Sequence, residues 1–88
     1  MEIIYLNSFL KDLKKVQDKK LLQKVKAILL ELKSAKDLCA VPNSKKLSGH
    51  PFAYRIRIGD YRLGLFYSEE NLTIARFVKR NDIYKLFP

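Results

Sequence analysis

The sequence is poor in the residues from which disulfides, zinc sites and glycine-rich phosphate loops are built. It contains one cysteine, Cys39, and one histidine, His50, which excludes an internal disulfide and a closed structural zinc site. Its three glycines are too scattered to form a phosphate-binding loop. We expect Cys39 to be a small apolar side chain in a reducing compartment. The composition therefore predicts neither a metal nor a cofactor.

Long apolar segments are also missing. No run approaches the length of a membrane span, and the first residues, MEIIYLNS, have neither the basic start nor the apolar segment of a signal peptide. A chain of 88 residues is the size of one small domain. We therefore expect a single cytoplasmic domain spanning residues 1–88, with no membrane association.

Acidic residues are scarce relative to basic ones. Nine Asp and Glu stand against 18 Lys and Arg, giving a formal net charge of +9 and a pI near 9.8. Such an excess predicts a polyanionic partner. Nucleic acid, an acidic protein and an anionic membrane surface all fit, and charge alone does not choose among them.

Hydrophobic periodicity predicts an α+β fold of order β-α-α-β-β-β with a short C-terminal helix. Asn7 or Ser8 is expected to cap the first helix, and Asn81 or Asp82 the last. The expected segments are a strand at 2–6, a second helix ending near Ser34, a connection at 36–52, a hairpin at 54–67, a turn at 68–71 and a strand at 72–78. We expect the helical hairpin to pack on one face of a mostly antiparallel sheet, leaving the other face outside.

Residues 54–67, YRIRIGDYRLGLFY, alternate as a β-hairpin with a two-residue Gly-Asp loop. That loop predicts a register with Arg57 opposite Arg62 and Arg55 opposite Gly64. Like charges directly across a strand pair are destabilising unless an anion lies between them, and Gly64 leaves room for a close approach. Alternatively, the arginines merely keep a wet sheet face soluble.

Arginine and lysine occupy different regions. Every arginine lies between positions 55 and 80, whereas lysines are spread over the helices. Arginine presents a rigid fork of donors suited to phosphate, while lysine is a point charge. The lysine-rich helix exteriors are either solvated surface or contact nucleic-acid phosphates at a distance.

Four further side chains are candidates outside the hairpin. Histidine often acts as a general base near neutral pH. His50 is therefore either a residue with a chemical role or an ordinary surface side chain in a loop. Tyr84 either anchors the C-terminal helix or presents its ring to a substrate. Lys46, His50 and Lys79 are candidates for substrate binding.

The runs KKLSGHPFAYRIRIGDYRLGLFY and ARFVKRNDIYKLF, on a chain of this element order, resemble the RelE/ParE superfamily of bacterial and archaeal toxins. The resemblance covers essentially the whole chain and is densest over residues 45–67 and 76–86. In the RelE branch the toxin is a metal-independent endoribonuclease, an mRNA interferase that cuts messenger RNA in the ribosomal A site. In the ParE branch a similar fold poisons DNA gyrase without cleaving RNA. The resemblance favours the RelE branch.

The resemblance implies five catalytic residues. By position, Arg62 resembles the arginine that clamps the scissile phosphate, Arg80 the one that assists the leaving group, and Tyr84 the tyrosine that stacks on a base. Arg55 and Arg57 fall where some members have lysines credited with base and electrostatic roles.

That last substitution moves the general base elsewhere, because arginine does not lose its proton in the working range. Candidates for the proton acceptor are Lys46, His50, Lys79 and the ribosome itself.

The resemblance also implies a cognate antitoxin in a hetero-oligomer with the toxin, with ribosome and messenger RNA as the other partners. A charge of +9 suggests an acidic antitoxin, expected to contact the helical layer, the sheet edge and the basic face. A small basic RNA-binding module or an inactive toxin remnant is a further alternative.

Overall fold

The computed structural model describes residues 1–69 and 71–88, apart from the side chain of Cys39, so the expectations for Cys39 and for Glu70 in the turn lie outside the described part. Within it the chain forms an α+β fold, as predicted. The elements are β1 (Glu2–Tyr5), α1 (Asn7–Lys14), α2 (Lys19–Ser34), a 3-10 helix (Leu38–Ala40), β2 (Ser44–Lys46), β3 (Ala53–Ile58), β4 (Tyr61–Ser68), β5 (Asn71–Lys79) and α3 (Arg80–Leu86).

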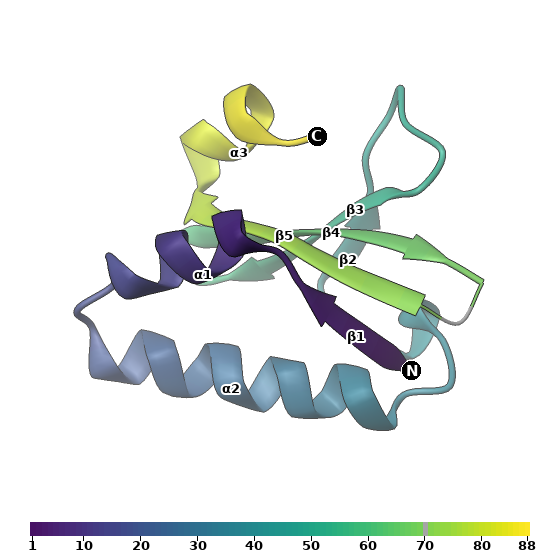
Figure 1. Cartoon of the computed structure of the whole chain (residues 1–88), viewed down its shortest axis with the longest axis horizontal. Helices are drawn as coiled ribbons and strands as arrows, with labels where there is room; N and C mark the ends of the chain where they lie inside the picture. The colour runs from purple at the N-terminus through teal and green to yellow at the C-terminus, as the bar shows by residue number, and fades with distance from the viewer. Residues whose placement is uncertain (70) are drawn as a thin grey trace.

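The strands form one sheet in the order β1-β5-β4-β3-β2 (Figure 1). β1 runs parallel to β5, and the other pairs are antiparallel, which confirms a mostly antiparallel sheet. The predicted hairpin register is also confirmed, with Arg57 opposite Arg62 and Arg55 opposite Gly64. We call the sheet face that carries these three arginines the arginine face, and the opposite face the helix face.

The helix face carries the main hydrophobic core. Side chains from α1, α2 and the central strands meet there, including Phe9, Val25, Leu32, Leu63 and Phe77. Figure 1 shows α2 running along this side of the sheet and α3 lying on the other. The layer of α1 and α2 on one face was therefore predicted correctly.

The sequence predicted that the arginine face would be left outside. In the structure, part of this face is covered. Ala53 and Ala75 on the sheet form a second, smaller core with Ile83 and Phe87 at the C-terminus. Two alanines leave a shallow surface into which these larger side chains fit. One end of the arginine face is consequently covered by α3.

The predicted N-cap of the first helix was wrong. Asn7 is already helical, and the residue before it, Leu6, has no side-chain cap. The Ser8 hydroxyl instead donates to the carbonyl oxygen of Ala75 at 2.6 Å. Ser8 thus ties α1 to β5 rather than closing its own helix.

The last helix also begins earlier than predicted. β5 continues directly into α3, whose first residue is Arg80, and neither Asn81 nor Asp82 occupies the cap position. The Arg80 backbone N–H donates to the carbonyl oxygen of Asp60, in the hairpin loop, at 2.9 Å. This bond fixes the start of α3 beside the hairpin loop.

The connection at residues 36–52 contains structure that was not predicted. Besides the 3-10 helix it holds β2, which pairs antiparallel with β3. Its sequence, SKK, has no apolar alternation, so periodicity gives no sign of a strand. Its register places Lys45 opposite Arg55 and Lys46 opposite Tyr54.

Candidate functional site

Arg62 is the most buried cation of the arginine face, with 8% of its surface exposed. It lies on β4 opposite Arg57. One terminal nitrogen, Nη1, donates to the carbonyl oxygens of Gly59 at 3.0 Å and Tyr61 at 2.9 Å. Its Nε is buried and has no hydrogen-bond partner. The hairpin therefore holds the Arg62 guanidinium in place without satisfying all of its donors.

Other cations crowd around Arg62. Burial lowers the pKa of Arg62, and the charges of Arg55, Arg80 and Arg57 lower it further, while Tyr84 acts in the opposite direction. Arginine stays charged at any working pH, so this repulsion persists in the folded protein. A bound anion would relieve it. We call Arg55, Arg57, Arg62, Arg80 and Tyr84 the arginine cluster.

α3 brings two members of this cluster to the sheet. Ile83 of α3 and Phe87, which directly follows the helix, face inward and are buried. In contrast, Arg80 is exposed and Tyr84 is 64% exposed. Tyr84 therefore does not anchor the helix, because Ile83 and Phe87 do so. Its ring and hydroxyl are free to meet a ligand.

Gly64 has a different role from the one expected. A Cβ added to it would lie 2.8 Å from Cγ of Phe87 and 3.2 Å from Cδ1 of Ile83, distances shorter than van der Waals contact. The space beside Arg55 is thus filled by the chain's own C-terminus. Gly64 admits α3, which carries Arg80 and Tyr84, rather than a ligand.

Lys45 joins the arginine face from β2, a position that sequence reasoning missed. It lies opposite Arg55, and partners across a strand pair project to the same face. An open groove is lined by Asn43, Ser44, Lys45, Arg55, Arg57 and Arg62. The sequence signal that could have identified Lys45 is strand alternation, because neighbouring residues on a strand project to opposite faces. Lys45, not Lys46, shares the face of Arg55.

Lys46 projects to the helix face, whereas His50 lies on the arginine face at the far end from the Arg57–Arg62 pair. Lys46 is opposite Tyr54, whose ring packs against the main core on the helix face. His50 accepts a hydrogen bond at Nδ1 from the N–H of Phe52 at 3.2 Å, and its ring centre is 5.4 Å from that of Phe66.

The sheet register indicates how far His50 lies from the Arg57–Arg62 pair. Phe66, against which His50 packs, pairs with Ala53. Ala53 precedes Arg57 by four residues on β3, or about 13 Å along a strand. His50 therefore sits at the opposite end of the hairpin from the Arg57–Arg62 pair.

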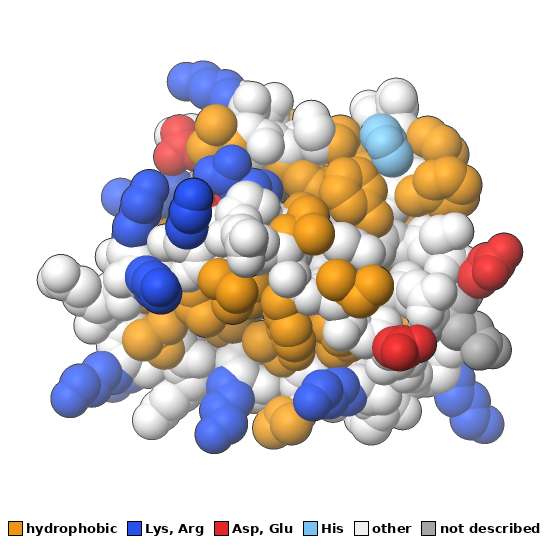
Figure 2. All heavy atoms as spheres, viewed as in Figure 1, with side chains coloured by type: hydrophobic (Ala, Val, Ile, Leu, Met, Phe, Trp, Pro, Cys, Tyr) orange, Lys and Arg blue, Asp and Glu red, His pale blue; other side chains and the backbone are white. Residues whose placement is uncertain are grey.

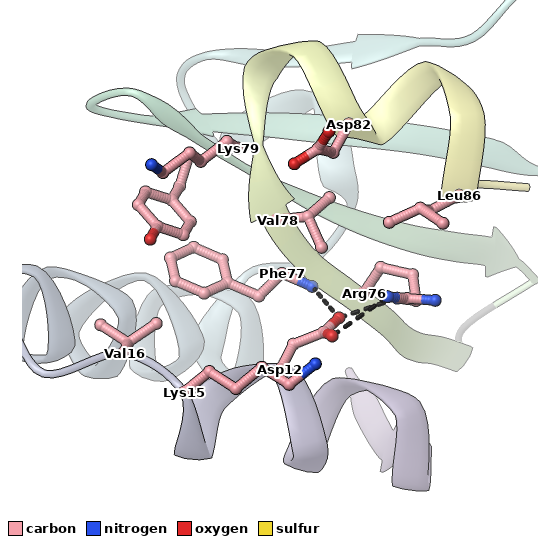
Figure 3. A pocket seen from close by; sticks show the side chains of 10 residues that line it. Asp12, Lys15, Val16, Arg76, Phe77, Val78, Lys79, Asp82 and Leu86 are labelled. Atoms are coloured by element: carbon pink, nitrogen blue, oxygen red, sulfur yellow. Dashed lines mark hydrogen bonds and ion pairs between the residues drawn. The ribbon is translucent and has the colours of Figure 1, made fainter.

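Lys79 also projects away from the arginine face. It pairs with Tyr61, whose ring stacks on Phe77 of the main core. Figure 3 shows Lys79 in the wall of a pocket that Asp12 and Asp82 also line. Lys79 and Arg80 are adjacent in sequence, but their side chains thus lie on different surfaces.

Arg76 is held by a carboxylate in that same pocket (Figure 3). Asp12, 6% exposed, accepts from Nε of Arg76 at 2.8 Å, from its Nη2 at 3.1 Å and from the N–H of Phe77 at 3.0 Å. This two-pronged ion pair ties α1 to β5. Among the described residues, Arg76 is therefore the one arginine that is paired with a carboxylate of the chain.

Apolar side chains reach the surface near the sheet edge formed by β1. Ile4, Leu6 and Leu10 are 54%, 37% and 42% exposed, and Figure 2 shows hydrophobic side chains at the surface of the side that carries β1 and α1. β1 pairs only with β5 and so ends the sheet. Such an edge, with exposed apolar neighbours, is suited to contact with another chain.

Two absences apply to residues 1–69 and 71–88. No three His, Cys, Asp or Glu side chains described there are grouped so that they could hold a metal ion. No helix in this part of the chain is both long and apolar enough to cross a membrane.

Known toxins resemble this chain in sequence. Residues 3–84 match the family described as ParE toxin of type II toxin-antitoxin system, parDE. The chain is 32% identical over 89 residues to Toxin RelE3 of Methanocaldococcus jannaschii, and the match covers 100% of both proteins.

Solved structures extend the comparison. A RelB-RelE antitoxin-toxin complex from Methanococcus jannaschii matches with a TM-score of 0.82 and 30% identity, over 97% of this chain and 99% of that chain. The YoeB dimer from Staphylococcus aureus shares the fold, with a TM-score of 0.70 and 24% identity over 90% of this chain and 94% of that one. The chain belongs to the RelE/ParE superfamily of toxins of type II toxin-antitoxin systems and is RelE-like.

Proposed function

We propose that this toxin is an mRNA endoribonuclease whose arginine cluster binds and cleaves at a phosphodiester. The observation that carries the proposal is the groove that Arg55 and Arg57 line together with the buried Arg62. Arg80 and Tyr84 are close enough to influence the charge of Arg62. Arginine forks match phosphate oxygens. Because the four arginines repel one another, a ligand with concentrated negative charge would stabilise them most.

The chemistry we propose is an internal transfer at phosphorus. The 2′-oxygen attacks the adjacent phosphorus while the bond to the 5′-oxygen breaks, which leaves a 2′,3′-cyclic phosphate and a 5′-hydroxyl. Arg55, Arg57 and Arg62 stabilise the charge that builds on the phosphate oxygens. Arg80 stabilises the negative charge on the departing 5′-oxygen, which takes its proton from water, and Tyr84 stacks on a neighbouring base.

The proton of the 2′-hydroxyl needs an acceptor that the arginines do not supply. Of the acceptors suggested by the sequence, Lys46 and Lys79 project to the other face of the sheet. His50 packs on Phe66, at the far end of the hairpin from the Arg57–Arg62 pair. We therefore assign the acceptor to the ribosome. Free RNA should then be bound by the toxin but left intact.

The proposal includes a cognate antitoxin as partner. The RelE of Methanococcus jannaschii was solved as a complex with RelB, and a net charge of +9 favours an acidic antitoxin. The apolar surface at Ile4, Leu6 and Leu10 offers a hydrophobic contact beside the open edge of β1. An antitoxin segment that also reaches the arginine cluster would block it.

A second candidate function is inhibition of DNA gyrase without nuclease activity. The observation that favours it is the match of residues 3–84 to the ParE toxin family. In that case the arginines would contact protein, and they need not surround a phosphate.

The two functions differ in what fails first when the toxin is expressed in growing cells. A nuclease halts protein synthesis before any DNA damage response, and Arg80→Ala abolishes the arrest. Lys26→Ala on α2 removes the same charge from an exposed site and leaves the arrest intact. DNA breaks that precede translation arrest, or an Arg80→Ala variant that still arrests growth, would contradict the nuclease assignment.

A further inference from the structure

A basic groove continues beyond the arginine cluster toward α2. The groove that holds Lys45, Arg55 and Arg57 is also lined by Asn43. A second open groove is lined by Asn43 and Arg57 again, together with Lys24 of α2. The two grooves therefore meet at Asn43 and Arg57 and form one surface. We call this surface the α2 groove.

Asn43 is fixed at the junction by its backbone. Its φ of 66° lies in the left-handed region, which asparagine tolerates better than most residues. Its carbonyl oxygen accepts a hydrogen bond from the N–H of Arg57 at 3.2 Å. The exposed side-chain amide offers both donors and an acceptor. A ligand that passes from one groove to the next would meet it.

The sign of the charge defines how far the groove extends. Within the described part of the chain, its lining consists of cations, polar neutral residues and small apolar residues, without a carboxylate. Carboxylates begin in the adjoining groove, where Asp18 and Asp60 lie with Lys20 and Lys24. The surface lined by cations without carboxylates therefore runs from Lys45 to Lys24, and beyond Lys24 the two signs of charge are balanced. A polyanion would be attracted along this surface more strongly than beyond it.

We propose that the α2 groove holds the phosphates of single-stranded RNA that flank the nucleotides at the arginine cluster, with Lys24 as the outermost phosphate contact. This rests on the proposed function, because it takes RNA as the ligand of the cluster. An RNA strand bound at Arg57 must leave in some direction, and the α2 groove continues its charge. Ala27 and Ile28 of α2 supply apolar surface for ribose and base.

The helix provides a matched control. Lys24 and Lys26 are both exposed on α2, but at about 100° per residue they project about 200° apart. Lys24→Gln and Lys26→Gln remove the same charge, and only Lys24 lines the groove. The probe is a short mixed-sequence 2′-O-methyl RNA, which lacks the attacking hydroxyl and stays uncleaved.

Binding is measured by fluorescence anisotropy over a range of salt concentrations. Lys24→Gln should weaken binding severalfold more than Lys26→Gln does. It should also reduce the slope of log affinity against log salt by about 0.7, the value for one lost contact on a single strand. Arg57→Gln serves as the reference for loss of a cluster contact.

The outcomes separate the groove from the proposed function. Equal effects of Lys24→Gln and Lys26→Gln, with Arg57→Gln still weakening binding, would overturn the groove and leave the cluster as an RNA site. An Arg57→Gln variant that binds RNA like the wild type would contradict the proposed function itself. If Lys24→Gln weakened binding to polyglutamate as much as to RNA, the groove would be an acidic-protein surface and the RNA assignment would be wrong.

Discussion

At the scale of single residues, the arginines divide into one that is paired within the chain and four that are not neutralised there. Arg76 is held by Asp12, whereas Arg62 is surrounded by Arg55, Arg57 and Arg80. Sequence alone could not separate them, because Asp12 lies far away along the chain. Pairing with a carboxylate indicates a structural role for Arg76, and mutual repulsion makes the other four the candidate site for an anion.

The ion pair between Asp12 and Arg76 predicts a large loss of stability on truncation. Asp12→Ala leaves a partly buried guanidinium and the N–H of Phe77 without an acceptor, which should lower the free energy of unfolding by about 3 kcal/mol. Asp18→Ala removes only the N-cap of α2 and should cost about 1 kcal/mol. Urea unfolding measures both, and equal costs would contradict a structural role for the pair.

The repulsion around Arg62 predicts a specific response to anions. Sulfate should raise the melting temperature of the wild type more than chloride does at equal ionic strength, because it binds between the arginines. Sulfate also stabilises proteins generally by exclusion from their surface, so the test compares two variants of equal charge. The excess stabilisation should shrink in Arg57→Gln and persist in Lys26→Gln. An identical excess in both would show that no anion site exists at the cluster.

At the scale of elements, the hairpin could be predicted from sequence and the docking of α3 could not. Alternation and the Gly-Asp loop define the register of β3 and β4 locally. Phe87 packs against Gly64, which is distant from it in the chain. No local sequence pattern predicts this contact. β2 was missed for the same reason, since its three polar residues become a strand only by pairing with β3.

The contact between Gly64 and Phe87 predicts coupled effects on α3. Gly64→Ala places a methyl group against the Phe87 ring and should cost about 1 to 3 kcal/mol. Phe87→Ala removes the obstacle, so the double variant should be more stable than the sum of the single effects allows. Urea unfolding gives the energies, and hydrogen exchange of the α3 amides reports its release. Additive changes in the free energy of unfolding would mean that the Phe87 ring does not lie against Gly64.

Gly64→Ala also bears on the candidate site. Because α3 carries Arg80 and Tyr84, its displacement should separate them from Arg62 without altering any residue of the arginine cluster. The resemblance suggested that these residues act together. It gave no indication that a glycine on β4 determines their distance.

At the scale of the whole molecule, most lysines lie apart from the arginine cluster, and Lys24 and Lys45 are the two that line the grooves beside it. The arginine cluster lies where the hairpin, α3 and β2 meet, and lysines are distributed over the helices. The net charge of +9 could be counted from the sequence. Which cations share one surface depends on how the fold places them. Of the cations proposed from sequence, Arg55, Arg57, Arg62 and Arg80 come together, and Lys46 and Lys79 face the other way.

The central claim is that the arginine cluster cleaves messenger RNA on the ribosome. The most direct test follows a defined messenger RNA on purified ribosomes with wild-type toxin, Arg57→Ala or Lys26→Ala, and with wild-type toxin but no ribosomes. We predict cleavage within the A-site codon by the wild type and Lys26→Ala, a loss of at least about 100-fold in rate for Arg57→Ala, and no cleavage of free RNA. An intact message on ribosomes, or equal cleavage by Arg57→Ala, would contradict it.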